Sequence, residues 1–236
     1  MEQNCITCFS NRTESLEAKI KALKLKYNLQ KLDFNFAEFY IEIFKVKNID
    51  ELLDRINEPE EIPFWAELWP AARGLAQFII QRRELLAQQT VLELGTGVGL
   101  AGIAAKLAGA DLVHTDFAPD ALEFVKLNYH LNQITDGKLL LADWKTFPTN
   151  LAQFDYLIGS DILYEKLLHD NLIGIFQALV KPGGAIWLAD PGRDYAKLFI
   201  DKIAKYNWQI SKEQIAVTER SQEMLIDIYQ LTRKNS

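Results

Sequence analysis

The 236-residue sequence predicts an α/β fold: a doubly wound, seven-stranded mixed sheet with its last strand antiparallel, preceded by an N-terminal extension with a helix and strands. From residue 64 onward, strand-like and helix-like patterns alternate, which is typical of a mostly parallel sheet with helices on both faces. The last two strand-like runs have no helix between them, so we expect an antiparallel hairpin. A glycine-rich turn joins one early strand to the helix after it, as in nucleotide-binding sheets.

The first 62 residues form the predicted extension. In NRTESLEAKIKALKLKYNL, apolar residues recur at helical spacing after an Asn11/Glu14 cap signal, which predicts a helix. FNFAEFYIEIFKV (34–46) alternates and is rich in aromatic and β-branched residues, so we expect one or two strands. NIDELLDRI (48–56) predicts a short capped helix, and NEPEEIP (57–63) predicts a linker.

Residues 63–236 are predicted to form one domain. Its strands are short apolar runs, its helices follow the 3.6-residue period, and Pro119 opens one helix because proline suits a first helical turn. KPGG (181–184) is interpreted as a stop before the next strand. In chain order we predict a helix 71–87, a strand 90–94, a helix 98–108, a strand 111–116, a helix 119–131, strands 138–142 and 154–160, a helix 166–180, a strand 185–190, a helix 194–206 and strands 208–217 and 224–232.

Composition and charge narrow the class of protein. Hydrophobic residues make up 49% and charged residues 25%, an ordinary globular balance. The net charge of −6 disfavours a nucleic-acid partner, because phosphate binding usually shows as clustered Lys and Arg. The sequence has no run of about 20 apolar residues and no signal-peptide core, so we expect neither a membrane span nor export.

Two cysteines, Cys5 and Cys8, lie together in CITC. A zinc site needs four ligands and no second pair follows, so no metal site is predicted. We interpret the pair as thiols on a mobile N-terminal segment, and so few cysteines fit a reducing, cytoplasmic location. The three histidines, at positions 114, 130 and 169, show no metal-like spacing and are interpreted as structural.

The stretch TVLELGTGVGLAG (90–102) predicts a ligand site. Glycines let a ligand approach the backbone because they have no Cβ, and the following helix offers free N–H groups and the positive end of its dipole. Dinucleotide enzymes use G-x-G-x-x-G, but Leu100 stands where the third glycine belongs. The glycines at 95, 97 and 99 follow G-x-G-x-G instead, with a turn that serves packing alone as the alternative.

Acidic residues accompany this turn. Asp116 ends the next strand, where a carboxylate can accept both ribose hydroxyls of an adenosine ligand. Asp143 ends the strand after it, where it can meet an adenine amine, and Trp144 offers an apolar wall. Glu93 lies inside an apolar strand, and an unpaired acid is costly to bury there. The ammonium group of S-adenosylmethionine (SAM) would supply a partner, whereas a pyrophosphate would repel the acid. SAM is therefore favoured over NAD, with an ordinary exposed acid and core packing as the alternatives for Asp116 and Trp144.

These motifs resemble class I SAM-dependent methyltransferases, and specifically methyltransferase family 16, many members of which methylate protein lysines. The resemblance rests on the order of PFWAELWPAARGLAQFI, VLELGTGVGLAGIAA, HTDF, ADW and GSDILY, between residues 63 and 190. The N-terminal strands and PFWAELWP are most similar to bacterial relatives of the mitochondrial enzyme that methylates the β-subunit of electron-transfer flavoprotein. Residues 1–50 depart from the better-known eukaryotic members.

The resemblance implies a cofactor site and a substrate site. Asp161 and Tyr164 match the family's D-x-x-Y motif at the end of the fourth strand, where the substrate lies, and they are the predicted catalytic residues. The predicted cofactor-binding residues, together with their motif neighbours, are Trp69, Glu93, Gly95, Thr96, Gly97, Gly99, Asp116, Phe117, Asp143, Trp144 and Ser160.

Methyl transfer to a lysine needs a neutral amine, alignment and a dry site. Deprotonating a lysine of free pKa about 10.4 at pH 7 costs roughly 4.6 kcal/mol; desolvation and a nearby sulfonium both lower that cost, so no His base is required. We expect Asp161 to accept a hydrogen bond from the amine and Tyr164 to wall the channel by cation–π contact, with a helix cap and a core residue as the alternatives. SDILY lacks the prolines of the Asn-Pro-Pro-Tyr motif in amide and nucleobase methylases, which favours a tetrahedral amine.

The sequence thus predicts a SAM-dependent methyltransferase that acts on an amine, with a protein lysine as the expected acceptor and S-adenosylhomocysteine as the product. A small-molecule N-methyltransferase, an NAD-dependent oxidoreductase and a non-catalytic SAM-binding module are the alternatives. In ADPGR (189–193), Asp190 and Arg193 share one rim of the expected cleft and are candidates for substrate contact, with an ordinary turn as the alternative. The oligomeric state stays open.

Overall fold

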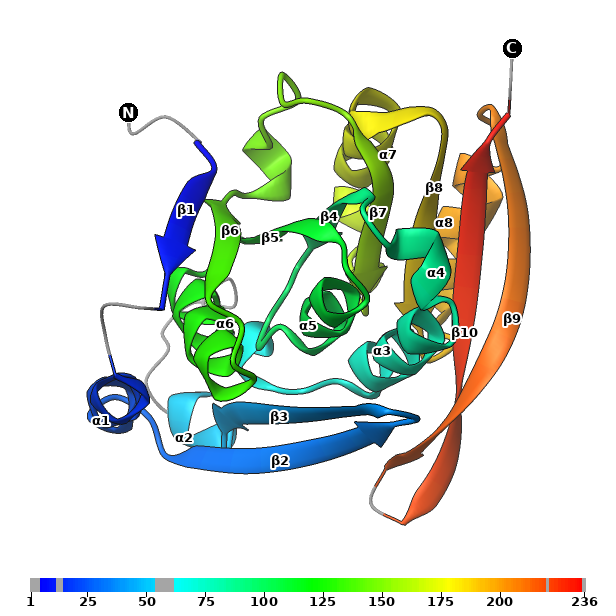
Figure 1. The fold of residues 1–236 in the computed structure, drawn as a ribbon. Coiled ribbons are helices and arrows are strands. Elements are labelled where there is room, and N and C mark those ends of the chain that lie inside the picture. The colour runs from blue at the N-terminus through cyan, green and yellow to red at the C-terminus, as the bar shows by residue number, and fades with distance from the viewer. Residues whose placement is uncertain (1–4, 12–14, 54–61, 220, 235–236) are drawn as a thin grey trace.

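The computed structural model describes residues 5–11, 15–53, 62–219 and 221–234. Within them, eight strands form one sheet in the order β1-β6-β5-β4-β7-β8-β10-β9, and two strands form a separate hairpin (Figure 1). The strands are β1 Thr7–Ser10, β2 Leu29–Phe36, β3 Phe39–Val46, β4 Thr90–Leu94, β5 Asp111–Asp116, β6 Asp136–Leu141, β7 Phe154–Ser160, β8 Val180–Asp190, β9 Trp208–Glu219 and β10 Gln222–Arg233. The α-helices are α1 Leu16–Lys24, α2 Asp50–Leu53, α3 Pro70–Gln81, α4 Arg83–Leu86, α5 Leu100–Leu107, α6 Pro119–Leu131, α7 His169–Leu179 and α8 Asp194–Ile203.

The main sheet confirms the predicted fold class. Strands β6, β5, β4, β7 and β8 run parallel, and β10 lies antiparallel between β8 and β9. The predicted C-terminal hairpin is therefore correct, and both of its strands extend further toward the connecting turn than predicted. Because the central strands are parallel, their carboxyl ends meet at one edge, where the loops after β4, β5, β6 and β7 come together.

Helices cover both faces of the sheet. Figure 1 shows α3, α5 and α6 on one side and α7 and α8 on the other. Strand β4 contributes to both layers because successive side chains point to opposite faces: Val91 joins the core beside α5, and Leu92 and Leu94 join the core beside α7. By the same alternation, Glu93 points toward α5.

The N-terminal residues add an unpredicted eighth strand. β1 pairs antiparallel with β6 and forms the edge of the sheet, with Thr7 opposite Leu139. Its Phe9 ring lies 5.5 Å from the ring of Tyr129, and a Cβ on Gly137 would lie 2.3 Å from Phe9. The prediction of a mobile segment is therefore wrong at Cys8, which lies inside β1; both thiols are exposed and free.

The β2-β3 hairpin packs on the outer side of α5 and α6 (Figure 1). Its Ile41 and Ile43 are fully buried in the core that those helices share, and β2 begins five residues before the predicted start. The preceding helix α1 is capped by Ser15, whose side chain accepts a hydrogen bond from the Ala18 N–H, and not by Asn11. Residues 57–61 of the predicted linker 57–63 lie outside the described residues, so the domain boundary after residue 62 stays a prediction.

Two further elements differ from their predictions. KPGG comes just after the helix that it was predicted to stop, since α7 ends at Leu179, but the next strand begins earlier than predicted: β8 runs through KPGG from Val180, with a register shift opposite β7. A Cβ on Gly184 would lie 2.7 Å from the Asp155 carbonyl oxygen, so glycine permits this close approach. The predicted helix 71–87 breaks at Arg82, which leaves helical geometry and pairs with Glu213 of β9. None of the helices in the described ranges is long and apolar enough to cross a membrane.

Candidate active site

A cavity of about 540 Å³ opens at the carboxyl edge of the parallel strands. The loops after β4, β5, β6 and β7 form one side of it, and the segment before α3 forms the other. All but two of the predicted site residues line it: Trp69, Gly95, Thr96, Gly97, Asp116, Phe117, Asp143, Trp144, Ser160, Asp161 and Tyr164. Glu93 and Gly99 lie outside its lining.

The glycine turn after β4 needs backbone conformations that favour glycine. Gly95, Gly97 and Gly99 have φ of +66°, +51° and +91°. A Cβ on Gly97 would lie 3.2 Å from the Trp65 carbonyl oxygen, and a Cβ on Gly95 would lie 3.1 Å from the Trp144 ring. Side chains here would crowd the space between the turn and the opposite wall. Gly99 lies outside the cavity lining, as the N-cap residue directly before α5.

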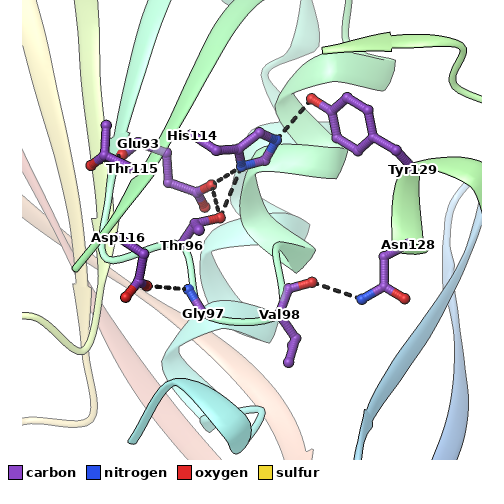
Figure 2. A network of polar contacts seen from close by, with 9 residues as sticks. All are labelled: Glu93, Thr96, Gly97, Val98, His114, Thr115, Asp116, Asn128 and Tyr129. Carbon is purple, nitrogen blue, oxygen red and sulfur yellow. Dashed lines mark hydrogen bonds and ion pairs between the residues drawn. The ribbon is translucent and has the colours of Figure 1, made fainter. Parts of the chain in front are cut away.

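Asp116 is fixed at the cavity by the same turn. Its carboxylate accepts a hydrogen bond from the backbone N–H of Gly97, at 2.9 Å (Figure 2). It accepts a second one from the backbone N–H of Ala118, at 3.0 Å. Burial raises the pKa of Asp116 to about 6, although these N–H groups partly offset the effect. The carboxylate therefore ends β5 as a buried acceptor beside the glycine turn.

Glu93 has a partner inside the protein that sequence reasoning missed. Its Oε2 lies 2.5 Å from both the Thr96 hydroxyl and His114 Nδ1, and His114 Nε2 lies 2.8 Å from the Tyr129 hydroxyl (Figure 2). A Cβ on Gly102 of α5 would lie 2.3 Å from this Glu93 oxygen, so the absence of a side chain there makes room for the network. Glu93 therefore supports the turn from behind through Thr96, and the buried acid that the sequence analysis paired with a ligand ammonium is paired with His114.

The end of β6 supplies the next part of the cavity. The Asp143 side chain accepts a hydrogen bond from the Lys145 N–H and caps a short 3₁₀ helix, Trp144–Thr146. This cap orients the start of the turn, so that Asp143 and Trp144 both line the cavity. Phe117 and Ser160 line it from the ends of β5 and β7, and Phe117 is 53% exposed at the mouth.

Aromatic side chains form the opposite wall. Phe64 lies in a short 3₁₀ helix, Phe64–Ala66, that precedes α3. Its ring lies 5.5 Å from the ring of Tyr164 and 6.3 Å from that of Trp69, whose indole N–H donates to the Phe64 carbonyl. Burial raises the pKa of Tyr164 to about 12, so its hydroxyl stays protonated at physiological pH. Phe64 was not assigned a role from the sequence, although it lies in the PFWAELWP motif.

Asp161 has an unusual backbone conformation and forms a bidentate ion pair. Its φ is +54°, in the left-handed region that non-glycine residues seldom adopt, and its N–H donates to the Ala189 carbonyl. Arg193 donates to both of its carboxylate oxygens, from Nε at 2.8 Å and from Nη2 at 2.9 Å. The alternative of a helix cap for Asp161 is therefore not what the structure shows.

The β2-β3 hairpin is bound to the cavity wall through an ion pair. Lys45 of β3 is largely buried, and its ammonium donates to both carboxylate oxygens of Glu67, which lines the cavity. The sequence offers no signal for this pair, because the two residues belong to different predicted domains. In the described ranges, no group of three or more His, Cys, Asp and Glu side chains is arranged to hold a metal ion.

These features fit SAM. Asp116 suits the ribose, Asp143 and Trp144 suit the adenine, and the Cβ-free turn leaves room for the methionine part. An acidic residue at the turn, bonded to the Gly97 N–H, occupies the place where a pyrophosphate would need free N–H groups.

The comparisons with known proteins agree with this geometry. The model of a family described as lysine methyltransferase matches residues 50–206. The chain is 29% identical over 137 residues to the rat electron transfer flavoprotein beta subunit lysine methyltransferase, covering 57% of the chain and 53% of that protein. It is 29% identical over 172 residues to mouse EEF1A lysine methyltransferase 3, covering 70% of each. A histone-arginine methyltransferase of Xenopus laevis is 32% identical over 160 residues, covering 64% of the chain and 68% of that protein.

Solved structures show the same fold. The Thermus thermophilus 16S rRNA N2 G1207 methyltransferase, in complex with AdoMet and guanosine, aligns with a TM-score of 0.61 at 14% identity, covering 87% of this chain and 51% of that one. The ribosomal protein L11 methylase of Lactobacillus delbrueckii aligns with a TM-score of 0.51 at 26% identity, covering 68% and 78%.

The matches cover different shares of this chain and of its relatives. The matched segment spans about half the length of the flavoprotein-related relative. The family match, in contrast, covers more than half of this chain and includes every predicted site residue. The resemblance predicted from the sequence is confirmed, as is SAM as the cofactor of this fold and family. The chain therefore belongs to the lysine methyltransferase family.

Proposed function

We propose that this protein transfers a methyl group from SAM to the side-chain amine of a protein lysine. One observation carries the proposal: Asp161 and Tyr164 of the D-x-x-Y motif face the same cavity as the glycine turn and Asp116. The relatives support the choice of acceptor, because two of those named above are lysine methyltransferases that act on proteins.

The chain's own residues hold the two reactants. Asp116 accepts from the ribose hydroxyls, Asp143 and Trp144 hold the adenine, and Trp69 closes the wall opposite the Gly95–Gly97 turn. When bound, SAM supplies an electrophilic methyl group. The protein's contribution is therefore alignment and exclusion of water around the acceptor nitrogen.

The acceptor must reach the methyl group as a neutral amine. Phe64, Trp69 and Tyr164 offer an apolar, aromatic lining that disfavours a charged ammonium by desolvation. The protonated hydroxyl of Tyr164 adds no negative charge. Asp161 can accept a hydrogen bond from the amine N–H, which aims the nitrogen lone pair away from the carboxylate.

The mouth of the cavity favours a macromolecular acceptor over a small amine. Phe64, Phe117 and Leu167 all line the cavity and are 38%, 53% and 84% exposed. Large apolar side chains in contact with water at a pocket rim are typical of surfaces that other proteins cover. An enzyme for a small amine would be expected to close its cavity with the N-terminal segment. The described N-terminal strands instead pack on α5, α6 and β6, which supports the same choice.

Tritiated SAM and a cell lysate test the proposal. The wild-type protein should place label on proteins, recovered as methyllysine after hydrolysis. Asp161→Ala should bind SAM with unchanged affinity and transfer no label. Label confined to small molecules would favour the small-molecule alternative instead, and calorimetric binding of NAD without SAM would overturn the assignment of the cavity.

A further inference from the structure

The ion pair between Asp161 and Arg193 has a geometry that a simple turn does not require. Both oxygens of Asp161 are engaged by one planar guanidinium, at 2.8 and 2.9 Å. The Asp161 side chain is 4% exposed, whereas that of Arg193 is 40% exposed. A bidentate pair of this kind fixes the orientation of the carboxylate as well as its position.

Arg193 approaches from outside the cavity. Asp161 lines the cavity and Arg193 does not. Arg193 comes from the loop between β8 and α8, where its own N–H and that of Gly192 donate to Asp190 Oδ1. Its guanidinium carbon lies 6.0 Å from the Trp69 ring centre, at the edge of the aromatic wall. Each carboxylate oxygen of Asp161 therefore keeps acceptor capacity for the side that faces the cavity.

A bare carboxylate at this place would hinder the reaction. An uncompensated negative charge beside the acceptor nitrogen stabilises its ammonium form, which has no lone pair for the methyl group. The acidic groups that surround this point are Asp116, Asp190 and Glu165, each of which adds negative charge; Tyr164 stays neutral. Among the described residues, Arg193 is the cation bonded to Asp161.

We infer that Arg193 is a positioning residue for methyl transfer: it fixes the Asp161 carboxylate and cancels its charge, so that the acceptor amine meets a neutral ion pair. This inference rests on the proposed function. Arg193 touches neither reactant; it acts through Asp161, and the strained backbone of Asp161 places the carboxylate between the guanidinium and the cavity.

The test uses n-butylammonium as a probe for the lysine side chain and n-butanol as its uncharged analogue. Calorimetry compares the wild type, Arg193→Gln, Arg193→Lys and the double variant Asp161→Asn/Arg193→Gln. Arg193→Gln leaves the carboxylate bare, so it should bind n-butylammonium at least fivefold more tightly and n-butanol no more tightly than the wild type. Arg193→Lys keeps the charge but loses the bidentate fork, so it should gain only about twofold, and the double variant should lose the gain.

The outcomes separate this inference from the proposed function. Equal n-butylammonium affinity in the wild type and Arg193→Gln, or a gain that persists in the double variant, would overturn the role of Arg193. If Arg193→Gln fails to fold, Arg193→Lys retains the charge but loses the bidentate fork and should still bind n-butylammonium about twofold more tightly; no change would count against the inference. Absence of SAM binding by the folded wild type would instead defeat the proposed function.

The same variants give a second readout in methyl transfer. With lysate proteins as acceptors, the rate of Arg193→Gln relative to the wild type should be lowest at pH 7 and should recover as the pH rises toward 9, because the amine then loses its proton without help. A rate loss that is constant with pH would indicate that Arg193 only maintains the fold.

Discussion

The pH dependence of SAM binding gives a direct test of the part played by Asp116. Its pKa in the free protein is about 6, raised chiefly by burial. A ribose needs the carboxylate form as a hydrogen-bond acceptor, so only the ionised fraction of the protein is competent to bind. The apparent dissociation constant rises as that fraction falls.

The magnitude follows from the titration. For a pKa of about 6, roughly half of the Asp116 side chains are ionised at pH 6 and about a tenth at pH 5, so SAM affinity should fall about twofold and about tenfold from its value at pH 8. The sign is opposite for the stability of the free protein. The folded state binds the Asp116 proton more tightly than the unfolded chain, so stability is lost as pH rises from about 4 to about 6, by about 3 kcal/mol.

Isothermal titration calorimetry from pH 5 to pH 8 measures the first effect, and urea unfolding without SAM measures the second. Asp116→Asn is the matched control: it should bind SAM more weakly at every pH, with a flat pH profile. Wild-type affinity that is constant from pH 5 to pH 7, or a slope that survives in Asp116→Asn, would refute the assignment of this carboxylate to the ribose.

Three further substitutions test the turn and its supports. Gly97→Val should abolish SAM binding while circular dichroism stays native-like, because a Cβ there lies 3.2 Å from the Trp65 carbonyl at a φ of +51°; retained binding would contradict close backbone approach. Glu93→Ala should lower the free energy of unfolding, measured in urea, by about 3–5 kcal/mol, because it leaves His114 buried without its acidic partner. A loss below about 1 kcal/mol would count against the network. Asn128→Ala should lower the free energy of unfolding by about 3 kcal/mol, because three hydrogen bonds are lost, and it should also weaken SAM binding. Unchanged SAM affinity would indicate that the N-terminal hairpin does not influence the glycine turn.

The parallel strands were the most predictable part of the fold. β4, β5 and β7 begin and end as predicted, because each is a short apolar run bounded by turn residues. The edge strand β1 was missed because its four residues carry no pattern of their own and its pairing depends on β6, more than 120 residues away. The start of β8 was predicted too late because the glycines of KPGG, which indicate a turn, also allow a strand to pass close to a neighbouring backbone.

The site was predictable where the fold's topology determines it. Parallel strands bring Asp116, Asp143 and Asp161 to one edge whatever the details of packing. The groups that tune these residues were not predictable, because each partner is far away in the chain: Arg193 follows Asp161 by 32 residues. Glu93 shows the same limit. The sequence indicates that this buried acid needs a partner, and we expected a ligand to supply it, whereas the structure pairs Glu93 with His114.

The side-chain amides of α6 have a consequence for how this chain can vary. Asn128 and Asn132 exchange hydrogen bonds with Phe44 and Glu42 along β3, and Asn128 also donates to the Val98 carbonyl in the glycine turn (Figure 2). The two side-chain amides thus hydrogen-bond to the backbone edge of β3 as a neighbouring strand would. Homologues with a different N-terminus would have to replace both asparagines in step with it, so paired change at these positions should mark which relatives share this hairpin.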